Sequence, residues 1–228
     1  PDNEGFPRQV YVREGRRLEG IDFFTAHDAL PVNKGGRPPL HRTSVTASHY
    51  ALDSHAVRKR EPGRIHLDGF FSSPTAVYTV PYGVMVPRQI ENLLFPVAVS
   101  GSHVGFSTLR MEPCWMALGE AAGEAAALAI ESRLSVQKIP IDTLQQRLLD
   151  HGATLVFMRD LRPGDTDFTR VEQLALKGFF PDWEARLDRP LDEQTARLWS
   201  SLSGREIEAD TTLTRRDVIR KLADSTKL

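Results

Sequence analysis

The sequence predicts an α/β fold in two parts, a mixed sheet followed by a small helical region. Residues 92–131 join an apolar run, a polar loop and a helix rich in alanine and glycine. Residues 77–86 alternate in the way that is typical of a strand, and helical patterns dominate beyond about residue 135. We therefore expect strands and one long helix in residues 1–134, and helices in residues 135–228.

Composition bounds the class of protein. The chain has 228 residues, 40% of them hydrophobic and 26% charged, which is ordinary for a globular protein that can bury a core. A net charge of −1 gives no electrostatic reason to expect nucleic acid or an anionic membrane as a partner. No apolar run is long enough to span a bilayer, and Cys114, the single cysteine, excludes an internal disulfide.

Several short strands are expected in the first part. Residues 6–30 have the pattern of strand, turn and strand, and the Gly/Pro-rich residues 34–39 form a loop. Residues 77–86 alternate apolar and polar side chains but contain Pro81. Because proline cannot donate to a sheet ladder, this segment is expected to be an edge strand or a strand that breaks.

A strand, loop and helix follow at residues 93–132. Residues 93–99 have the length and β-branched content of a buried strand, and residues 100–107 form a Gly/Ser/His loop. Pro113 is expected in the first turn of a helix that ends near Ser132. The N-terminus of this helix would favour an anionic or electron-rich ligand, although tight packing of helix on strand is the alternative reason for its small residues.

Helices with recognisable ends fill the second part. We expect a helix over residues 141–149 with Asp142 as N-cap, and a turn at residues 162–167. A helix over residues 168–176 is expected to stop at Gly178. The two last helices are predicted to begin near Asp192 and at Thr214, with Asp217 completing a capping box.

Two histidines are candidates for proton transfer. His103 lies in the loop ahead of the long helix, with Ser100 and Ser102 nearby, and His55 follows Asp53 by two residues. A histidine can take a proton near neutral pH, and an adjacent aspartate can orient it. A structural role for His103, as a hydrogen-bonding partner between loop and sheet, stays open.

Two groups of charged side chains are further candidates for the site. Arg110 and Glu112 directly precede the long helix, where the arginine could hold a carboxylate or a carbonyl edge, or form a structural ion pair with a glutamate. A run of charges near the N-terminus has a solvated face as its simplest interpretation and a substrate-facing role as the alternative; it consists of Arg13, Glu14, Arg16 and Arg17.

Three segments resemble a known family. PRQVYVREGRRLEG (residues 7–20), ALDSHAV (residues 51–57) and NLLFPVAVSGSHVGFSTLRMEP (residues 92–113) resemble, in order and spacing, segments of FAD-dependent oxidoreductases of glutathione-reductase-like fold. The match is with the bacterial branch called xanthan lyase-related, and it covers roughly the first 135 residues.

The resemblance implies an FAD-dependent oxidoreductase. A flavin next to a histidine base fits oxidation of a CH–OH or CH–NH group by hydride transfer to the flavin, and the lack of loops rich in Trp or Tyr favours a small polar substrate. We expect catalytic roles for His103, His55 and Arg110, and flavin contacts at Ser100, Ser102, Glu112, Pro113, Met116 and Gly119. The seven histidines do not fall at zinc-ligand spacings, so no metal is expected. The family keeps a Gly-x-Gly-x-x-Gly motif near its N-terminus, which these residues lack. The chain is therefore expected to be a C-terminal portion that lacks the FAD-binding half and is inactive alone.

The second part weakly resembles an S-layer-homology-type module, on the order "helix, Gly-Phe-Phe-Pro-Asp, loop, Pro-Leu, helix". Such a unit would contact a cell-wall component or a protein partner. A helical appendage that packs on its own enzyme is the simpler interpretation. A non-catalytic binding module is accordingly the alternative to an enzyme.

Overall fold

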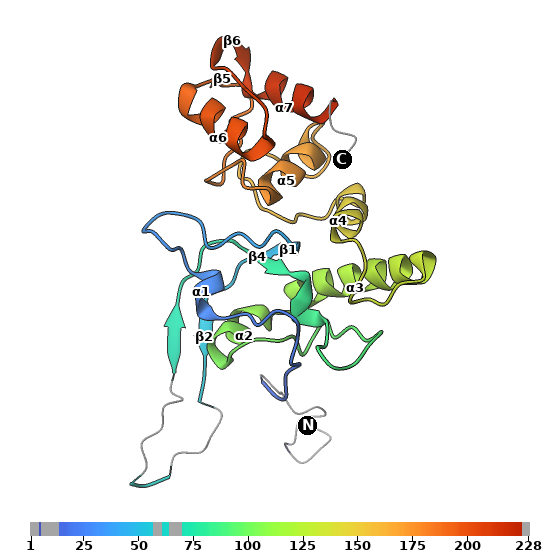
Figure 1. Cartoon of the computed structure of the whole chain (residues 1–228). Helices are drawn as coiled ribbons and strands as arrows, with labels where there is room; N and C mark the ends of the chain where they lie inside the picture. Colours follow the sequence, from blue (N-terminus) through green and yellow to red (C-terminus); the bar gives the residue numbers. More distant parts are fainter. Residues whose placement is uncertain (1–4, 6–13, 57–60, 64–69, 225–228) are drawn as a thin grey trace.

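The computed structural model describes residues 5, 14–56, 61–63 and 70–224 (Figure 1). It contains both helices and short strands, which confirms the α/β class. In chain order they are α1 (Ala26–Ala29), β1 (Ser44–Ser48), β2 (Leu52–Ser54), β3 (Phe71–Ser73), β4 (Tyr78–Pro81), the 3-10 turn η1 (Tyr82–Met85), α2 (His103–Leu109), α3 (Glu112–Ser132), α4 (Ile141–Asp150), α5 (Phe168–Leu176), β5 (Pro190–Leu191), α6 (Glu193–Ser203), β6 (Asp210–Thr214) and α7 (Arg215–Asp224).

The strands form separate antiparallel pairs rather than one mixed sheet. β1 pairs with β4 and β2 pairs with β3, with Ser48 opposite Tyr78 and Asp53 opposite Ser72. β4 ends at Pro81 and continues as η1, which confirms the expected strand that breaks at this proline. The expectation that strands predominate before residue 134 is wrong, because helices and irregular segments make up most of this part among the described residues.

The long helix α3 is confirmed, with Pro113 in its first turn. Its apolar stripe packs on the β1 side of the molecule, and Leu118, Ala121 and Ala125 are fully buried. Small side chains at the second and third of these positions let the helix axis lie close to the strands. The helix ends at Arg133, whose left-handed backbone (φ 55°) lets the next N–H bond back to Ala129 O.

Two segments that were predicted to be strands are irregular. Residues 93–99 form no strand, and Phe95 and Val97 are 43% and 47% exposed. The segment is instead held by single bonds, such as Phe95 N–H to Met85 O. Of residues 6–30, residues 6–13 lie outside the described part, and the others form α1 and two isolated bridges at Gly20 and Phe24. Without a neighbouring strand over their whole length, neither segment can form a ladder.

The helices of the second part follow the prediction closely. α5 spans Phe168–Leu176, and Gly178 has the positive φ (92°) expected of a helix stop. Asp192 caps α6, and Thr214 and Asp217 exchange the two bonds of a capping box at α7. The prediction for α4 is wrong in one respect, since Pro140 rather than Asp142 is its N-cap.

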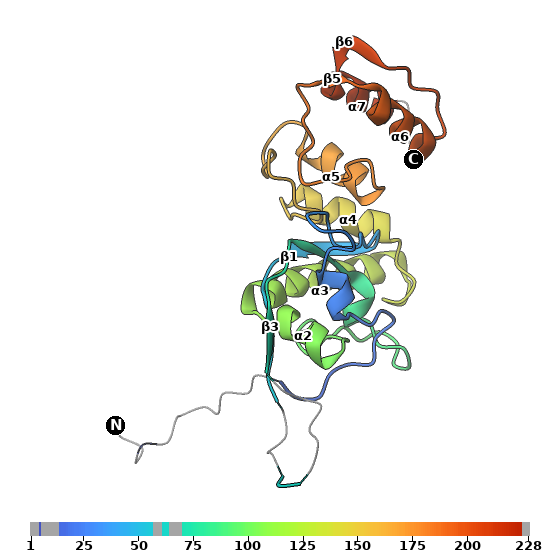
Figure 2. The same cartoon turned by 90° about the vertical axis from the view of Figure 1, so that its left-hand side faces the viewer.

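A short strand pair interrupts the otherwise helical second part. β5 pairs with β6 in antiparallel fashion and lies beside α6 and α7 at the far end of the molecule (Figure 2). Among the described residues, no helix combines the length and apolarity needed to cross a bilayer.

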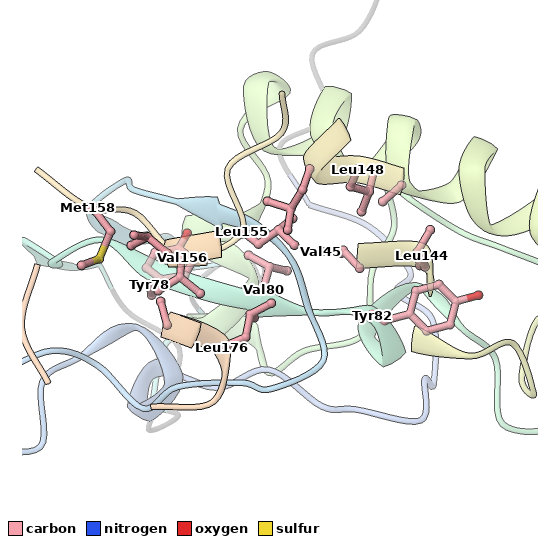
Figure 3. Packing of buried hydrophobic residues seen from close by; sticks show 14 of the residues in the cluster. Val45, Tyr78, Val80, Tyr82, Leu144, Leu148, Leu155, Val156, Met158 and Leu176 are labelled. Atoms are coloured by element: carbon pink, nitrogen blue, oxygen red, sulfur yellow. The ribbon is translucent and has the colours of Figure 1, made fainter. Parts of the chain in front are cut away.

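One continuous core links the two parts. Figure 3 shows side chains of the β1–β4 pair (Val45 and Val80), of α4 (Leu144 and Leu148) and Leu155, all members of one buried hydrophobic cluster. α4 packs against both α3 and α5. The predicted boundary at residue 134 stays a prediction, and the helix that follows it is part of the same packed core.

Side-chain bonds to the backbone join the loop at residues 34–39 to the second part. Arg37 donates to Asp182 O and Phe157 O at 2.6 and 3.0 Å and lies over the ring of Trp183. Glu172 is fully buried, and its Oε2 accepts the N–H groups of Leu155 and Val156 at 2.7 and 2.6 Å. Burial raises the pKa of the Glu172 carboxyl to about 7, against the opposing effects of these bonds and of the Arg37 charge.

The Glu172 carboxyl predicts a pH dependence of stability. Folding raises its pKa from 4.5 to about 7, so the folded chain holds a proton that the unfolded chain has already released between these values. Stability therefore falls as the pH rises through this window, by at most ~3 kcal/mol. Glu172→Gln keeps an oxygen for both N–H groups and should remove this slope.

Urea unfolding of the parent chain and of Glu172→Gln from pH 4.5 to 7.5 would measure how the free energy of unfolding depends on pH. Glu208→Gln is the matched control, because Glu208 is exposed and should leave the pH profile unchanged. An identical slope in Glu172→Gln and in the parent chain would show that Glu172 is ionised throughout.

Candidate functional site

Asp53 of β2 is the centre of a polar cluster between β2 and α2. Its Oδ2 accepts Arg110 Nη2 at 2.7 Å, and its Oδ1 lies 2.9 Å from His55 Nε2. Asp53 N–H donates to Ser107 Oγ of α2, which fixes the strand against the helix. The structure thus brings His55 and Arg110 together on one carboxylate. The ion pair of Arg110 expected with a glutamate is made with Asp53 instead.

His103, the first residue of α2, lies between two oxygen acceptors. Its Nδ1 is 2.6 Å from Glu14 Oε2, and its Nε2 is 2.7 Å from the backbone oxygen of His55. A positive charge at a helix N-terminus is disfavoured by ~0.3–1 kcal/mol. A hydrogen bond to a charged group contributes ~1.5–3 kcal/mol, so Glu14 more than offsets this effect.

Glu14 is a site residue that the sequence did not single out from its charged run. Its side chain is only 4% exposed, and Arg17 also binds Oε2, at 3.3 Å. Arg17 Nε in turn donates to Gly101 O. A solvated face is therefore the wrong interpretation for Glu14. Arg13 of the same run lies outside the described residues, so its predicted role is untested.

The loop ahead of α2 is more ordered than expected. Residues 103–107 of the predicted loop belong to α2 (His103–Leu109), and Ser102 is the N-cap, accepting Gly105 N–H at 3.0 Å. A side chain at Gly101 or Gly105 would meet Phe24 O at 2.8 or 2.4 Å. These glycines are therefore explained by packing on the preceding segment, and they do not form an open ligand cradle.

Ser100 is the one residue of this loop with an unused polar group. It is fully buried, its N–H donates to Val84 O, and its Oγ has no partner among the described residues. A buried hydroxyl without a partner costs free energy, so it is typical of a position where a ligand or water completes the bonding.

The remaining predicted flavin contacts lie on an open face of α3. Glu112 and Pro113 are exposed, Met116 is 75% exposed, and a side chain at Gly119 would meet nothing within 4 Å. The helix start offers fewer donors than expected, because Pro113 has no N–H and Cys114 donates to Met111 O. Gly119 is thus not required for close packing on this chain's own strands.

These residues fit one edge of a flavin, on two observations. The face of α3 that bears Met116 and Gly119 is uncovered, so a flat ring system can approach it. Ser100 Oγ, in the loop before α2, and Arg110 Nε, at the C-terminal end of α2, are buried polar atoms without partners among the described residues. The fit covers the ring only, since the 228 residues contain no glycine-rich phosphate-binding loop.

Thiol and metal chemistry find no support among the described residues. Burial raises the pKa of the Cys114 thiol to about 11, so the thiol stays neutral. The part of the chain that the structure describes contains no group of three or more potential metal ligands.

A cleft of about 560 Å³ lies elsewhere, in the second part of the chain. It is lined by residues of the loops before α5 and β5 and by Arg216 and Arg220 of α7. Both arginines bind the buried carboxylate of Asp167, and Arg216 also binds Asp188. The cleft contains none of the predicted site residues, and its principal cations are already paired.

The fold and this cluster define an α/β protein that gathers two histidines, an arginine and two carboxylates around α2, with His103 at the start of the helix and Arg110 at its end. A sequence family described as FAD dependent oxidoreductase matches residues 2–148, well over half of the chain. The chain therefore belongs to the FAD dependent oxidoreductase family, and FAD is its cofactor. The matched range includes most of α4. No curated protein and no solved structure matches the chain.

Proposed function

We propose that this chain forms the substrate-side wall of a flavin enzyme that oxidises a CH–OH or CH–NH group of a small polar molecule. The observation that carries the proposal is the Asp53 cluster, which holds His55 and Arg110 on one carboxylate beside the C-terminal end of α2. FAD, when bound, would accept the hydride that leaves the substrate carbon. The protein must then accept the proton from the substrate O–H or N–H.

The residues of this chain have three tasks in the proposal. His55 or His103 receives the proton. Arg110, held by Asp53, supplies positive charge near the electron-rich edge of the reduced cofactor or a polar substrate group. Ser100, Ser102, Glu112, Pro113, Met116 and Gly119 surround the ring, with the Ser100 hydroxyl free to bond and the Gly119 face open.

The dinucleotide half of the cofactor needs a partner in this proposal. Pyrophosphate is held by a glycine-rich loop at a helix N-terminus, and these residues contain no such motif. We place that half of the site outside residues 1–228. The three segments at residues 7–20, 51–57 and 92–113 support the xanthan lyase-related branch of the family.

An anaerobic substrate screen of the whole flavoprotein would test the reaction. Sugars, polyols, hydroxy acids and amines are added in turn while the flavin absorbance in the blue is followed. A substrate of the proposed class should bleach the flavin. If none does, and an enone or another acceptor reoxidises the chemically reduced protein, the enzyme is a reductase and the proposed direction is wrong.

A further inference from the structure

The hydrogen bonds around the two histidines separate their roles. His103 faces a carboxylate through Nδ1 and a backbone carbonyl through Nε2. Neither oxygen can donate a hydrogen, so both ring nitrogens of His103 must do so. In this arrangement the ring is an imidazolium and has no lone pair with which to accept a proton.

His55 is placed in the opposite way. Its Nε2 faces Asp53 Oδ1, which can only accept, so the ring proton of a neutral His55 lies on Nε2. Nδ1 has no hydrogen-bond partner among the residues that the structure describes, and the side chain is 34% exposed. The lone pair on Nδ1 is therefore available to a substrate, and Asp53 stabilises the ring when it becomes charged.

We infer that His55 is the proton acceptor of this site, and that His103 is a cationic positioning residue that holds the His55 backbone. The inference rests on the proposed function. In the balanced step, bound FAD would take the hydrogen of the substrate C–H bond together with its electron pair. The O–H or N–H proton moves to His55 Nδ1, and the electron pair of that bond forms the second bond of the C=O or C=N group. No other reactant is needed.

Two carboxylates position the two rings. Glu14 binds His103 and also Arg17, and Asp53 binds His55 and also Arg110. Because His103 Nε2 bonds to His55 O, the N-terminal segment at Glu14 is linked through α2 to the chain directly after β2. A change at Glu14 should therefore reach His55 without any direct contact between the two side chains.

Nitrogen NMR of the chain labelled with ¹⁵N-histidine would test the assignment without any cofactor. At neutral pH, the ring of His103 should show two protonated nitrogens, and that of His55 should show a proton on Nε2 alone. The variants His55→Gln and His103→Gln each remove one set of signals and thereby assign both. Glu14→Gln should convert His103 to a singly protonated ring.

Glu19→Gln is the matched control, since Glu19 is an exposed glutamate in the same N-terminal segment as Glu14 and should leave both rings unchanged. A singly protonated His103 in the parent chain, or a Glu14→Gln spectrum equal to that of Glu19→Gln, would overturn the inference. A substrate screen in which no compound bleaches the flavin would contradict the proposed function, but the protonation states of His55 and His103 would still be as predicted. The two results are therefore distinguishable.

Discussion

Replacing His55 by alanine should lower the rate at which substrate reduces the flavin in the whole protein by ~10²–10⁴-fold, the usual loss when a positioned general base is removed. The free energy of unfolding should change little. His55 is partly exposed and contributes one ring to an edge contact with Phe70 and one bond to Asp53. Stopped-flow absorbance under anaerobic conditions measures the rate, and urea unfolding measures the stability.

His49→Ala is the matched control, because His49 precedes the same strand and, among the residues that the structure describes, its ring bonds only to Thr75 O. His103→Arg adds a second comparison, since arginine keeps the positive charge and the donors but cannot accept a proton. It should retain far more activity than His55→Ala. Equal losses in these two variants, or an unchanged rate in His55→Ala, would contradict the assignment of His55 as base.

Arg110 is a poor choice for such a test. Its side chain is 6% exposed and bonds to both the backbone and the carboxylate of Asp53. Its removal would leave Asp53 without its closest cation and should cost ~1–3 kcal/mol of stability. A loss of activity in Arg110→Ala would then report on folding as well as on chemistry.

Local signals explain which elements the sequence could predict. A capping box at Thr214 and Asp217, or a stop at Gly178, depends on residues that lie within one turn of each other. The same holds for Pro113 in the first turn of α3. A strand depends on a partner far along the chain. Residues 93–99 have the composition of a buried strand, yet they pair with no strand over their length among the described residues.

The candidate site likewise has one contact between sequence neighbours, which could be predicted, and one between distant residues, which could not. Asp53 and His55 are neighbours in the sequence, so their bond could be anticipated, whereas the contact of Glu14 with His103 joins residues far apart in the sequence. The pattern of charges in such a run does not by itself indicate which side chain is buried. Two features could have drawn attention to Glu14: its place within a segment that resembles the family, and an isolated carboxylate between arginines.

Trp199→Ala should destabilise the second part of the chain by ~3–5 kcal/mol, the range for truncating a large buried aromatic side chain. Trp199 of α6 is fully buried, its Nε1 donates to Phe179 O at 2.9 Å, and its ring contacts Phe179 and Phe180. The variant loses the buried surface and leaves both a cavity and a carbonyl without its donor. Thermal unfolding and hydrogen exchange measure the loss.

Hydrogen exchange also shows whether the second part of the chain unfolds separately from the part that contains α3. α4 packs on α3 and α5, and Arg37 and Glu172 tie the loops around residues 155–157 to both parts. By contrast, α7 packs on β5, β6 and α5, and α6 is held through Trp199 to Phe179 and Phe180. Trp199→Ala should therefore speed exchange in α5–α7 and leave α3 protected.

Trp183→Ala is the control, because Trp183 is only half-buried and its removal should cost less stability. Uniform loss of protection, α3 included, would show that the two parts unfold as one unit.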